Sequence, residues 1–152
     1  MLFRSRYCNS RIVLEKSIVI SKAHKELLLN HASKWKPNES CAILYGSVEN
    51  EKSIVKDVFL AQNIDESPVN FTISNDELLK AYKIAEEKNL DVIGIFHSHP
   101  SSDAFPSSTD KKFMDTNPVV WVISSGGSDE LKAFLLEPDV KEISIVISSA
   151  EK

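Results

Sequence analysis

The chain is organised around the sequence IFHSHP at residues 95–100, which is followed by SSTD at residues 107–110. The apolar run before His97 has the composition of a β-strand that is buried on both faces. Side chains alternate between the two faces of a strand, so His97 and His99 project from the same face. Two imidazoles placed in this way can bind one metal ion. A third ligand would complete the site, and a carboxylate suits zinc in that role while one position stays open for water.

Spacing alone does not decide which carboxylate is the third ligand. Asp103 lies nearer in the sequence and could reach back from the loop at residues 101–106. Asp110 falls in the first turn of a helix that Ser107 or Ser108 would cap. Ser107 and Asp110 are spaced i, i+3 and would lie on one side of that turn. Both aspartates remain candidates on this reasoning.

The wider pattern resembles the JAMM motif of the MPN+ metalloprotease family. That motif has His-x-His-Pro, then Ser-x-x-Asp six residues later, and an isolated glutamate far upstream; the matching residues are His97, His99, Pro100, Ser107, Asp110 and Glu39. The likeness continues after Glu39 and around Asn63, Ser67 and Pro68, and it spans about residues 17–136. The resemblance therefore implies that Asp110 is the third ligand.

The resemblance also implies a chemistry. His97, His99 and Asp110 would bind one zinc ion per chain, and Glu39 would activate the zinc-bound water as general base and then act as general acid. Ser107 matches the family residue whose hydroxyl stabilises the tetrahedral oxyanion. Active family members cleave peptide or isopeptide bonds after the C-terminal Gly-Gly of ubiquitin or ubiquitin-like proteins. Because long insertions are lacking, the chain is most similar to stand-alone prokaryotic members that process small ubiquitin-like or sulfur-carrier proteins.

The remaining sequence predicts one α/β (α+β) domain at residues 11–150 after an irregular leader at residues 1–10. Helices are predicted at residues 22–34 after Ser21, at residues 74–89, and after Ser107. In the second helix, Ser74 and Glu77 form a predicted capping box, and the predicted buried stripe consists of Leu78, Leu79, Tyr82 and Ala85. Strands are predicted at residues 12–14, 18–20, 40–48, 53–61, 71–73, 91–96, 118–125, 131–136 and 143–147. The resemblance implies a cytidine-deaminase-like fold with a curved mixed sheet flanked by helices.

Composition narrows the class of partner. The chain of 152 residues has 18 basic and 22 acidic residues. Its formal net charge of −4 therefore lacks the excess of positive charge that is typical of nucleic-acid-binding proteins. Its apolar runs are far shorter than the ~20 residues of a membrane helix, and no signal-peptide pattern is present. We therefore expect a cytoplasmic protein with neither a nucleic-acid nor a membrane partner. The sequence leaves open whether the chain forms a homodimer.

The cysteines and the other two histidines have simpler interpretations. Cys8 and Cys41 are expected to stay reduced thiols. Cys41 shares a strand face with Glu39 and could line the site, but a small buried hydrophobic residue is the favoured interpretation. His24 and His31 would lie about 10 Å apart along one helix and cannot chelate one ion together, so they are expected to be packing or surface residues.

Three alternative functions stay open. The first, within the same enzyme class, is removal of a C-terminal peptide from a sulfur-carrier protein. The second is a non-catalytic MPN scaffold within a larger complex, although such members typically lose metal ligands and this chain retains His97, His99 and Asp110. The third is a related branch associated with DNA repair, against which the acidic charge balance argues mildly.

Overall fold

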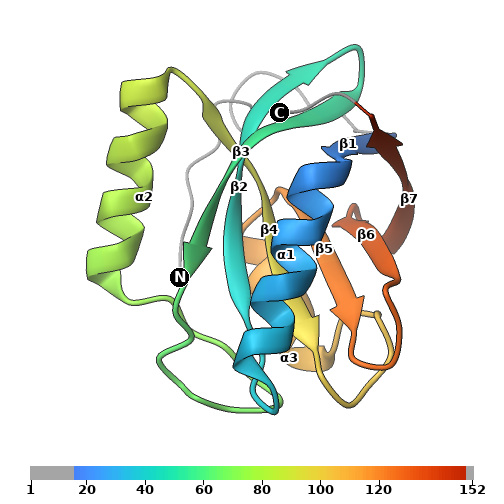
Figure 1. The fold of residues 1–152 in the computed structure, drawn as a ribbon. Helices are drawn as coiled ribbons and strands as arrows, with labels where there is room; N and C mark the ends of the chain where they lie inside the picture. The colour runs from blue at the N-terminus through green and yellow to red at the C-terminus, as the bar shows by residue number, and fades with distance from the viewer. Residues whose placement is uncertain (1–15, 150–152) are drawn as a thin grey trace.

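The computed structural model describes residues 16–149, which form three helices and seven strands (Figure 1). The helices are α1 (Lys22–Trp35), α2 (Asn75–Lys88) and α3 (Ser108–Thr116). The strands are β1 (Ser17–Ser21), β2 (Cys41–Glu49), β3 (Lys52–Ala61), β4 (Asp91–His99), β5 (Val120–Ser125), β6 (Leu131–Leu136) and β7 (Val140–Ser148). The predicted α/β class and its mixed sheet are confirmed. The predicted leader and the strand predicted at residues 12–14 lie outside the described residues.

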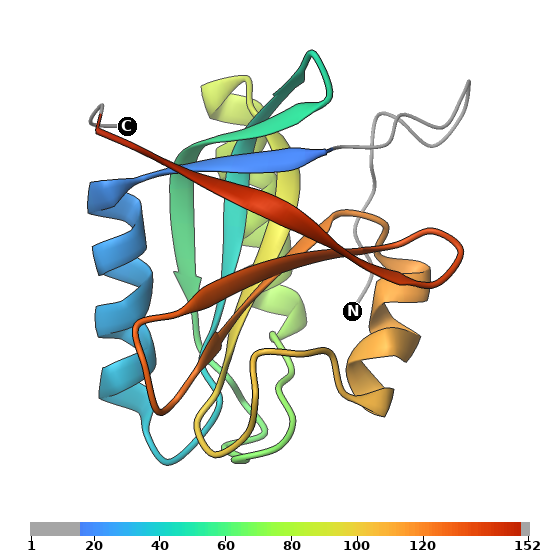
Figure 2. The same cartoon turned by 90° about the vertical axis from the view of Figure 1, so that its right-hand side faces the viewer.

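The sheet closes on itself, in the order β1-β3-β2-β4-β5-β6-β7. β1 is parallel to both β3 and β7, and β4 is parallel to β5, whereas the other neighbouring strands are antiparallel. β1 and β7 lie side by side across the molecule (Figure 2). Closure gives each strand a partner on both sides, which protects the backbone N–H and C=O groups that an open edge would expose.

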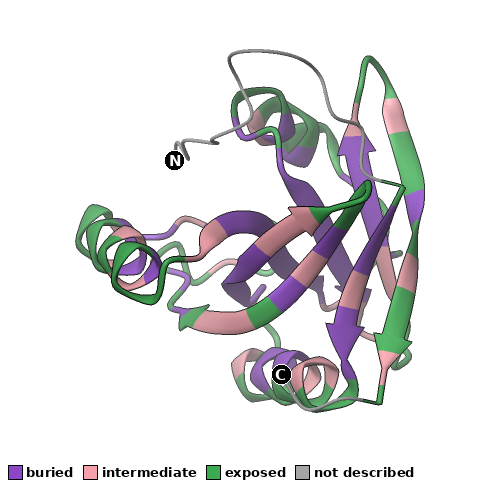
Figure 3. Cartoon of the chain, turned by 90° about the horizontal axis from the view of Figure 1, so that it is seen from above, coloured by how far each residue is buried: buried purple, intermediate pink, exposed green. Residues whose placement is uncertain are grey.

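Helices cover the sheet on opposite faces, so two apolar layers form. α1 lies on one side of the sheet and α3 on the other (Figure 2). The layer beneath α1 includes Leu28, Ala32, Leu44, Phe96 and Val122, and the layer beneath α2 and α3 includes Tyr45, Ile95, Met114, Trp121 and Phe134. The buried residues of the helices face the strands, and exposed residues face outward (Figure 3). No helix in residues 16–149 combines the length and the apolar character needed to cross a bilayer.

Serine caps begin all three helices, as predicted, but two details of α2 differ from prediction. Ser74 accepts a hydrogen bond from the Glu77 backbone N–H, at 3.2 Å. The Glu77 carboxylate does not complete the capping box, because it accepts a hydrogen bond from the Gln62 N–H at the end of β3 instead. Leu79, predicted to be buried, is 70% exposed, and Ala81 takes its place in the core. The tertiary position of α2 selects the helix face that is buried.

The strand predicted at residues 71–73 is wrong. This segment has no regular secondary structure and joins no strand of the sheet. The Thr72 N–H donates to the Asn63 side-chain oxygen, and the Thr72 carbonyl accepts from the Ile64 N–H, both at 3.0 Å. Phe71 and Ile73 are nevertheless buried in the layer beneath α2 and α3. The apolar pattern therefore correctly predicts core residues. The hydrogen bonds that a neighbouring strand would make to the Thr72 backbone are made by the preceding loop instead.

Candidate metal centre and active site

The end of β4 holds the two predicted histidine ligands in place. β4 pairs with β2 on one side and with β5 on the other, so the backbone of His97 is hydrogen-bonded between two strands. The Nε2 atoms of His97 and His99 are 3.0 Å apart. The His97 ring contacts Phe71 and Trp121 of the layer beneath α2 and α3, and the His99 ring contacts that of His97, whereas Ser98 lines a cavity on the opposite face of β4. The structure thus brings the two histidines together as the alternation of side chains predicts.

Asp110 completes this group from the first turn of α3. Its Oδ2 atom lies 3.1 Å from the Nε2 atoms of both His97 and His99. A capping box orients the carboxylate: Ser107 accepts from the Asp110 N–H at 3.0 Å, and the Ser107 N–H donates to Asp110 Oδ2 at 2.9 Å. Helix capping therefore aims the aspartate at the histidine pair.

Asp103, the other candidate carboxylate, contributes through its backbone. His99 Nδ1 donates a hydrogen bond to the Asp103 carbonyl at 2.7 Å, since a carbonyl oxygen can only accept. In the neutral imidazole this leaves the lone pair on Nε2, which faces Asp110. Such an outer hydrogen bond fixes both the tautomer and the ring orientation of a metal-binding histidine.

The converging atoms fit a zinc ion. The Nε2 atoms of His97 and His99 and the Oδ2 atom of Asp110 form a triangle with sides of 3.0, 3.1 and 3.1 Å. Ligands about 2.0–2.1 Å from a tetrahedral zinc ion are separated by about 3.3 Å. Glu39, His97 and His99 form a second, wider group whose candidate ligand atoms lie within 4.8 Å of one another. The group that contains Asp110 is the more compact one.

Electrostatics favour the metal-binding protonation states of Asp110 and His97 but not that of His99. Burial would raise the pKa of Asp110, but the hydrogen bonds from His97 and His99 outweigh it and lower that pKa. Complete burial lowers the pKa of His97. Burial also disfavours the charged form of His99, but hydrogen bonds to Asp110 and the Asp103 carbonyl raise the pKa of His99 overall. An anionic aspartate and a neutral imidazole are the forms that bind metal, so acid should weaken metal binding.

Glu39 lies beside these candidate ligands, two residues before β2 begins at Cys41. Its Oε2 atom is 4.0 Å from His99 Nε2, its Oε1 atom is buried without a hydrogen-bond partner, and the residue is 3% exposed. Burial raises the pKa of Glu39 to about 8. A buried carboxyl group with a strongly raised pKa, next to a cluster of metal-binding type, is characteristic of acid–base sites. The arrangement can hold or release a proton near neutral pH.

Ser107, Cys41 and His31 have structural contacts that the sequence interpretation anticipated. The Ser107 hydroxyl oxygen caps α3 by accepting a hydrogen bond from the Asp110 N–H. Cys41 is a free thiol, fully buried in the apolar layer, and burial raises its pKa, as expected for a small core residue. His31 Nε2 contacts the carbonyls of Cys41 and Ala61 at 3.0 and 3.1 Å. It is a buried packing residue.

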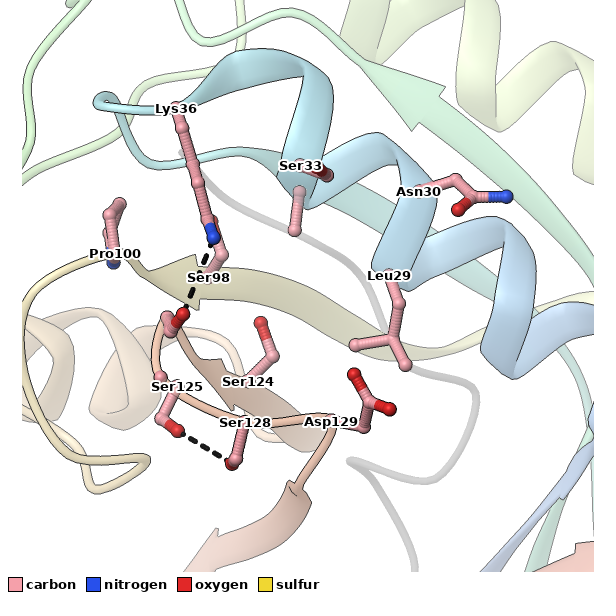
Figure 4. Close-up of a pocket in the computed structure, with 13 residues that line it drawn as sticks. Leu29, Asn30, Ser33, Lys36, Ser98, Pro100, Ser124, Ser125, Ser128 and Asp129 are labelled. Atoms are coloured by element: carbon pink, nitrogen blue, oxygen red, sulfur yellow. Dashed lines mark hydrogen bonds between the residues drawn. The ribbon is translucent and has the colours of Figure 1, made fainter.

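A separate cavity of about 370 Å³ lies on the opposite face of β4 (Figure 4). It is lined by α1 residues, by Ser98 and by the turn between β5 and β6, where the Lys36 ammonium donates to the Gly126 carbonyl at 3.3 Å. Ser98 reaches this cavity because it points away from His97 and His99. The cavity is therefore separated from the candidate metal centre by the strand itself.

Comparison with known proteins places this constellation in a family. Residues 21–137 match the family described as prokaryotic homologs of the JAB domain. The chain belongs to this prokaryotic JAB family. A desampylase from Pyrococcus furiosus is 37% identical over 111 residues, which cover 72% of this chain and 76% of that protein. A probable TtuB-protein conjugate cleaving protease from Thermus thermophilus is 33% identical over 118 residues, covering 77% of this chain and 74% of that protein.

The JAB fold is also seen in a solved relative. The solution structure of a protein from Desulfitobacterium hafniense has a TM-score of 0.81 and 30% identity, covering 89% of this chain and 95% of that one. The predicted resemblance to stand-alone prokaryotic members of the JAMM type is confirmed, as is the JAB domain fold. The match covers all of the residues predicted for the site, from Glu39 to Asp110.

Two residues near the JAB site were not singled out as functional by their sequence pattern. The sequence predicts only a turn role for Asn63, within the family likeness, yet Asn63 is 1% exposed and donates a hydrogen bond to the Glu39 carbonyl. Ser98 lies between the two histidines, and its hydroxyl accepts from the Ser40 N–H at 2.9 Å. The sequence signals for these residues are a polar residue between two histidines (Ser98) and an Asn-x-Asp turn (Asn63). Neither signal identifies the backbone groups, distant in the sequence, to which the side chain hydrogen-bonds.

Proposed function

We propose that this chain is a zinc-dependent peptidase that releases ubiquitin-like modifier proteins from their conjugates. The observation that carries the proposal is the convergence of His97, His99 and Asp110 within 3.1 Å, with the Glu39 carboxylate 4.0 Å from His99. The printed activities of the two relatives, a desampylase and a protease that cleaves TtuB-protein conjugates, support the same reaction class. We further propose that the modifier ends in Gly-Gly.

His97, His99 and Asp110 would hold the zinc ion. A zinc ion bound by three protein ligands supplies Lewis acidity, which lowers the pKa of water to about 7 and polarises a carbonyl. Glu39 accepts a proton from the attacking water and delivers it to the leaving amine. In the metal-free protein, burial raises the pKa of the Glu39 carboxyl group to about 8, which favours holding the proton between these two steps.

Ser107 would stabilise the tetrahedral adduct of the substrate. Its hydroxyl accepts the Asp110 N–H through oxygen, which leaves the hydroxyl proton available for donation to the substrate oxyanion. Removing one such donor typically raises the barrier by about 2.7–4 kcal/mol. The same residue can therefore cap α3 and serve the reaction.

The burial of the site favours a glycine-terminated tail. Glu39, His97, His99 and Asp110 are each at most 4% exposed, so little room exists beside the reacting atoms. Glycine allows a peptide backbone to approach closely, because it has no Cβ atom. A flexible C-terminal tail could therefore reach this site while the folded part of the modifier remains outside.

The decisive experiment offers two substrates to the zinc-loaded protein. One is a ubiquitin-like protein joined to a lysine side chain, and the other is the same protein with a linear peptide after its terminal glycine. We expect cleavage after that glycine, detected by intact-protein mass spectrometry, with loss of activity upon chelation and recovery with zinc. Cleavage of the linear substrate alone would favour processing of a sulfur-carrier protein. Failure to cleave either, or to bind zinc, would favour the scaffold function instead.

A further inference from the structure

The carboxylate of Glu39 depends on its backbone for its position. Neither oxygen accepts a hydrogen bond from any residue in the range 16–149, and the nearest ring nitrogen, His99 Nε2, is 4.0 Å from Oε2. The Glu39 backbone, in contrast, is held at both polar atoms. Its N–H donates to the Ser67 carbonyl at 2.8 Å, and its carbonyl accepts from Asn63 Nδ2 at 3.0 Å. Both partners belong to the loop at residues 62–70.

Asn63 uses its whole hydrogen-bonding capacity in this loop. Its Nδ2 donates to the carbonyls of Glu39 and Asn70, at 3.0 and 2.9 Å. Its Oδ1 accepts from the N–H groups of Asp65 and Thr72, each at 3.0 Å. An amide has two donor hydrogens and two acceptor lone pairs, so all four are used. A buried and fully satisfied amide of this kind has one orientation, which makes it a rigid link between the loop and Glu39.

The opposite side of the same segment is tied to the catalytic strand. Ser98 Oγ accepts from the Ser40 N–H at 2.9 Å, and the Ser98 N–H donates to the Ser40 carbonyl at 3.1 Å. The segment at residues 39–40 is thus held between β4, which carries both histidines, and the loop that contains Asn63. If the Asn63 contact is lost, Ser40 stays attached to β4 and the Glu39 backbone keeps only its N–H contact with Ser67, so Glu39 is less firmly held relative to His99.

We propose that Asn63 is a positioning residue that sets the place of the Glu39 carboxylate beside the metal ligands. This inference rests on the proposed function, in which Glu39 carries the proton. Asn63 contacts no reacting atom and acts through the Glu39 carbonyl. Displacing a catalytic group by about 1 Å can slow a reaction by about 100-fold, so a loss of this contact should be measurable in the chemical step.

The test substitution is Asn63→Asp. Aspartate has the same shape and can still accept from Asp65 and Thr72, but it cannot donate to the carbonyls of Glu39 and Asn70. The matched control is Thr72→Val, because the Thr72 hydroxyl donates to Asp65 Oδ2 at 2.8 Å within the same region and does not contact Glu39. For the zinc-loaded protein we expect Asn63→Asp to lower kcat about 10- to 100-fold, with KM and zinc content unchanged. Thr72→Val should keep the wild-type kcat.

Two further measurements separate positioning from general damage. Hydrogen exchange of the Glu39 amide should accelerate in Asn63→Asp and stay unchanged in Thr72→Val, because only the first substitution loosens the Glu39 backbone. In a Glu39→Gln background, Asn63→Asp should cause little additional loss of kcat, since a residue that acts through Glu39 has nothing left to position. If Asn63→Asp does not fold, Asn63→Ser, which is neutral and smaller, takes its place.

The outcomes decide between the two proposals. A wild-type chain that cleaves its substrate, together with an Asn63→Asp variant of unchanged kcat, would overturn the positioning role and leave the proposed function intact. Equal losses in Asn63→Asp and Thr72→Val, or losses that add fully to those of Glu39→Gln, would also overturn it. A wild-type chain that is inactive with zinc bound would overturn the proposed function, and the positioning role with it.

Discussion

Replacing Glu39 with glutamine tests the proposed chemistry most directly. The side chain is 4% exposed and makes no hydrogen bond within residues 16–149, so an amide of nearly the same shape should fit without breaking any contact. The amide cannot accept or deliver the proton. Losing a general base typically slows a reaction by about 10²- to 10⁴-fold, which corresponds to about 3–5 kcal/mol of barrier.

The zinc content of this variant is as informative as its rate. Glu39 Oε2 is 4.0 Å from His99 Nε2, whereas Asp110 Oδ2 is 3.1 Å from the same atom. If Asp110 is the third ligand, Glu39→Gln should retain one zinc ion per chain while kcat/KM falls. The assay pairs metal analysis by mass spectrometry with steady-state cleavage of a modifier conjugate. Glu87→Gln is the matched control, since Glu87 is an exposed residue of α2.

Two results would refute this reasoning. Full activity of Glu39→Gln would show that another group moves the proton. Loss of zinc together with activity would show that Glu39 is itself a ligand, in the wider group that Glu39 forms with His97 and His99. Both measurements are therefore needed on the same preparation.

Three further predictions concern the cap, a turn and pH. Ser107→Ala should lower kcat/KM by about 10²- to 10³-fold through loss of the oxyanion donor. It should also lower the free energy of unfolding by about 1 kcal/mol through loss of the helix cap. An unchanged kcat/KM would argue against the oxyanion role. Gly126→Ala should lower the melting temperature, because a Cβ atom at Gly126 would lie 1.9 Å from the Pro100 carbonyl oxygen. Gly127→Ala should leave it unchanged, because a Cβ atom there would meet nothing within 4 Å. Equal melting temperatures of the two variants would refute this reasoning. In the metal-free protein, burial raises the pKa of Glu39 from 4.5 to about 8, so over that range the folded state binds more protons and stability decreases as pH rises. Glu39→Gln should remove this decrease, so its free energy of unfolding at pH 7, measured by urea unfolding, should exceed that of the wild type by up to about 3 kcal/mol. Parallel pH profiles of the two proteins would contradict this prediction.

The core of the candidate site could be predicted from sequence because its geometry is local. Alternation along β4 places His97 and His99 on one face, whatever surrounds the strand. The Ser-x-x-Asp spacing produces a capping box, which directs Asp110 toward the strand end from which the chain has just emerged. Short-range rules of backbone geometry thus determine both parts, and the family pattern chose Asp110 over Asp103.

Long-range packing decided the remaining features of the fold and the site, because the local sequence around a residue does not determine which distant residues it contacts. The sequence alone determined the α/β class, the elements around residues 91–116 and the identity of the two histidines. Only the tertiary structure placed β1 between β3 and β7, exposed Leu79 and kept residues 71–73 out of the sheet. It also brought Asn63 against the Glu39 backbone, 24 residues away in the chain. Burial and hydrogen-bond satisfaction are properties of the whole folded chain, so they settle such contacts only once the sheet has closed.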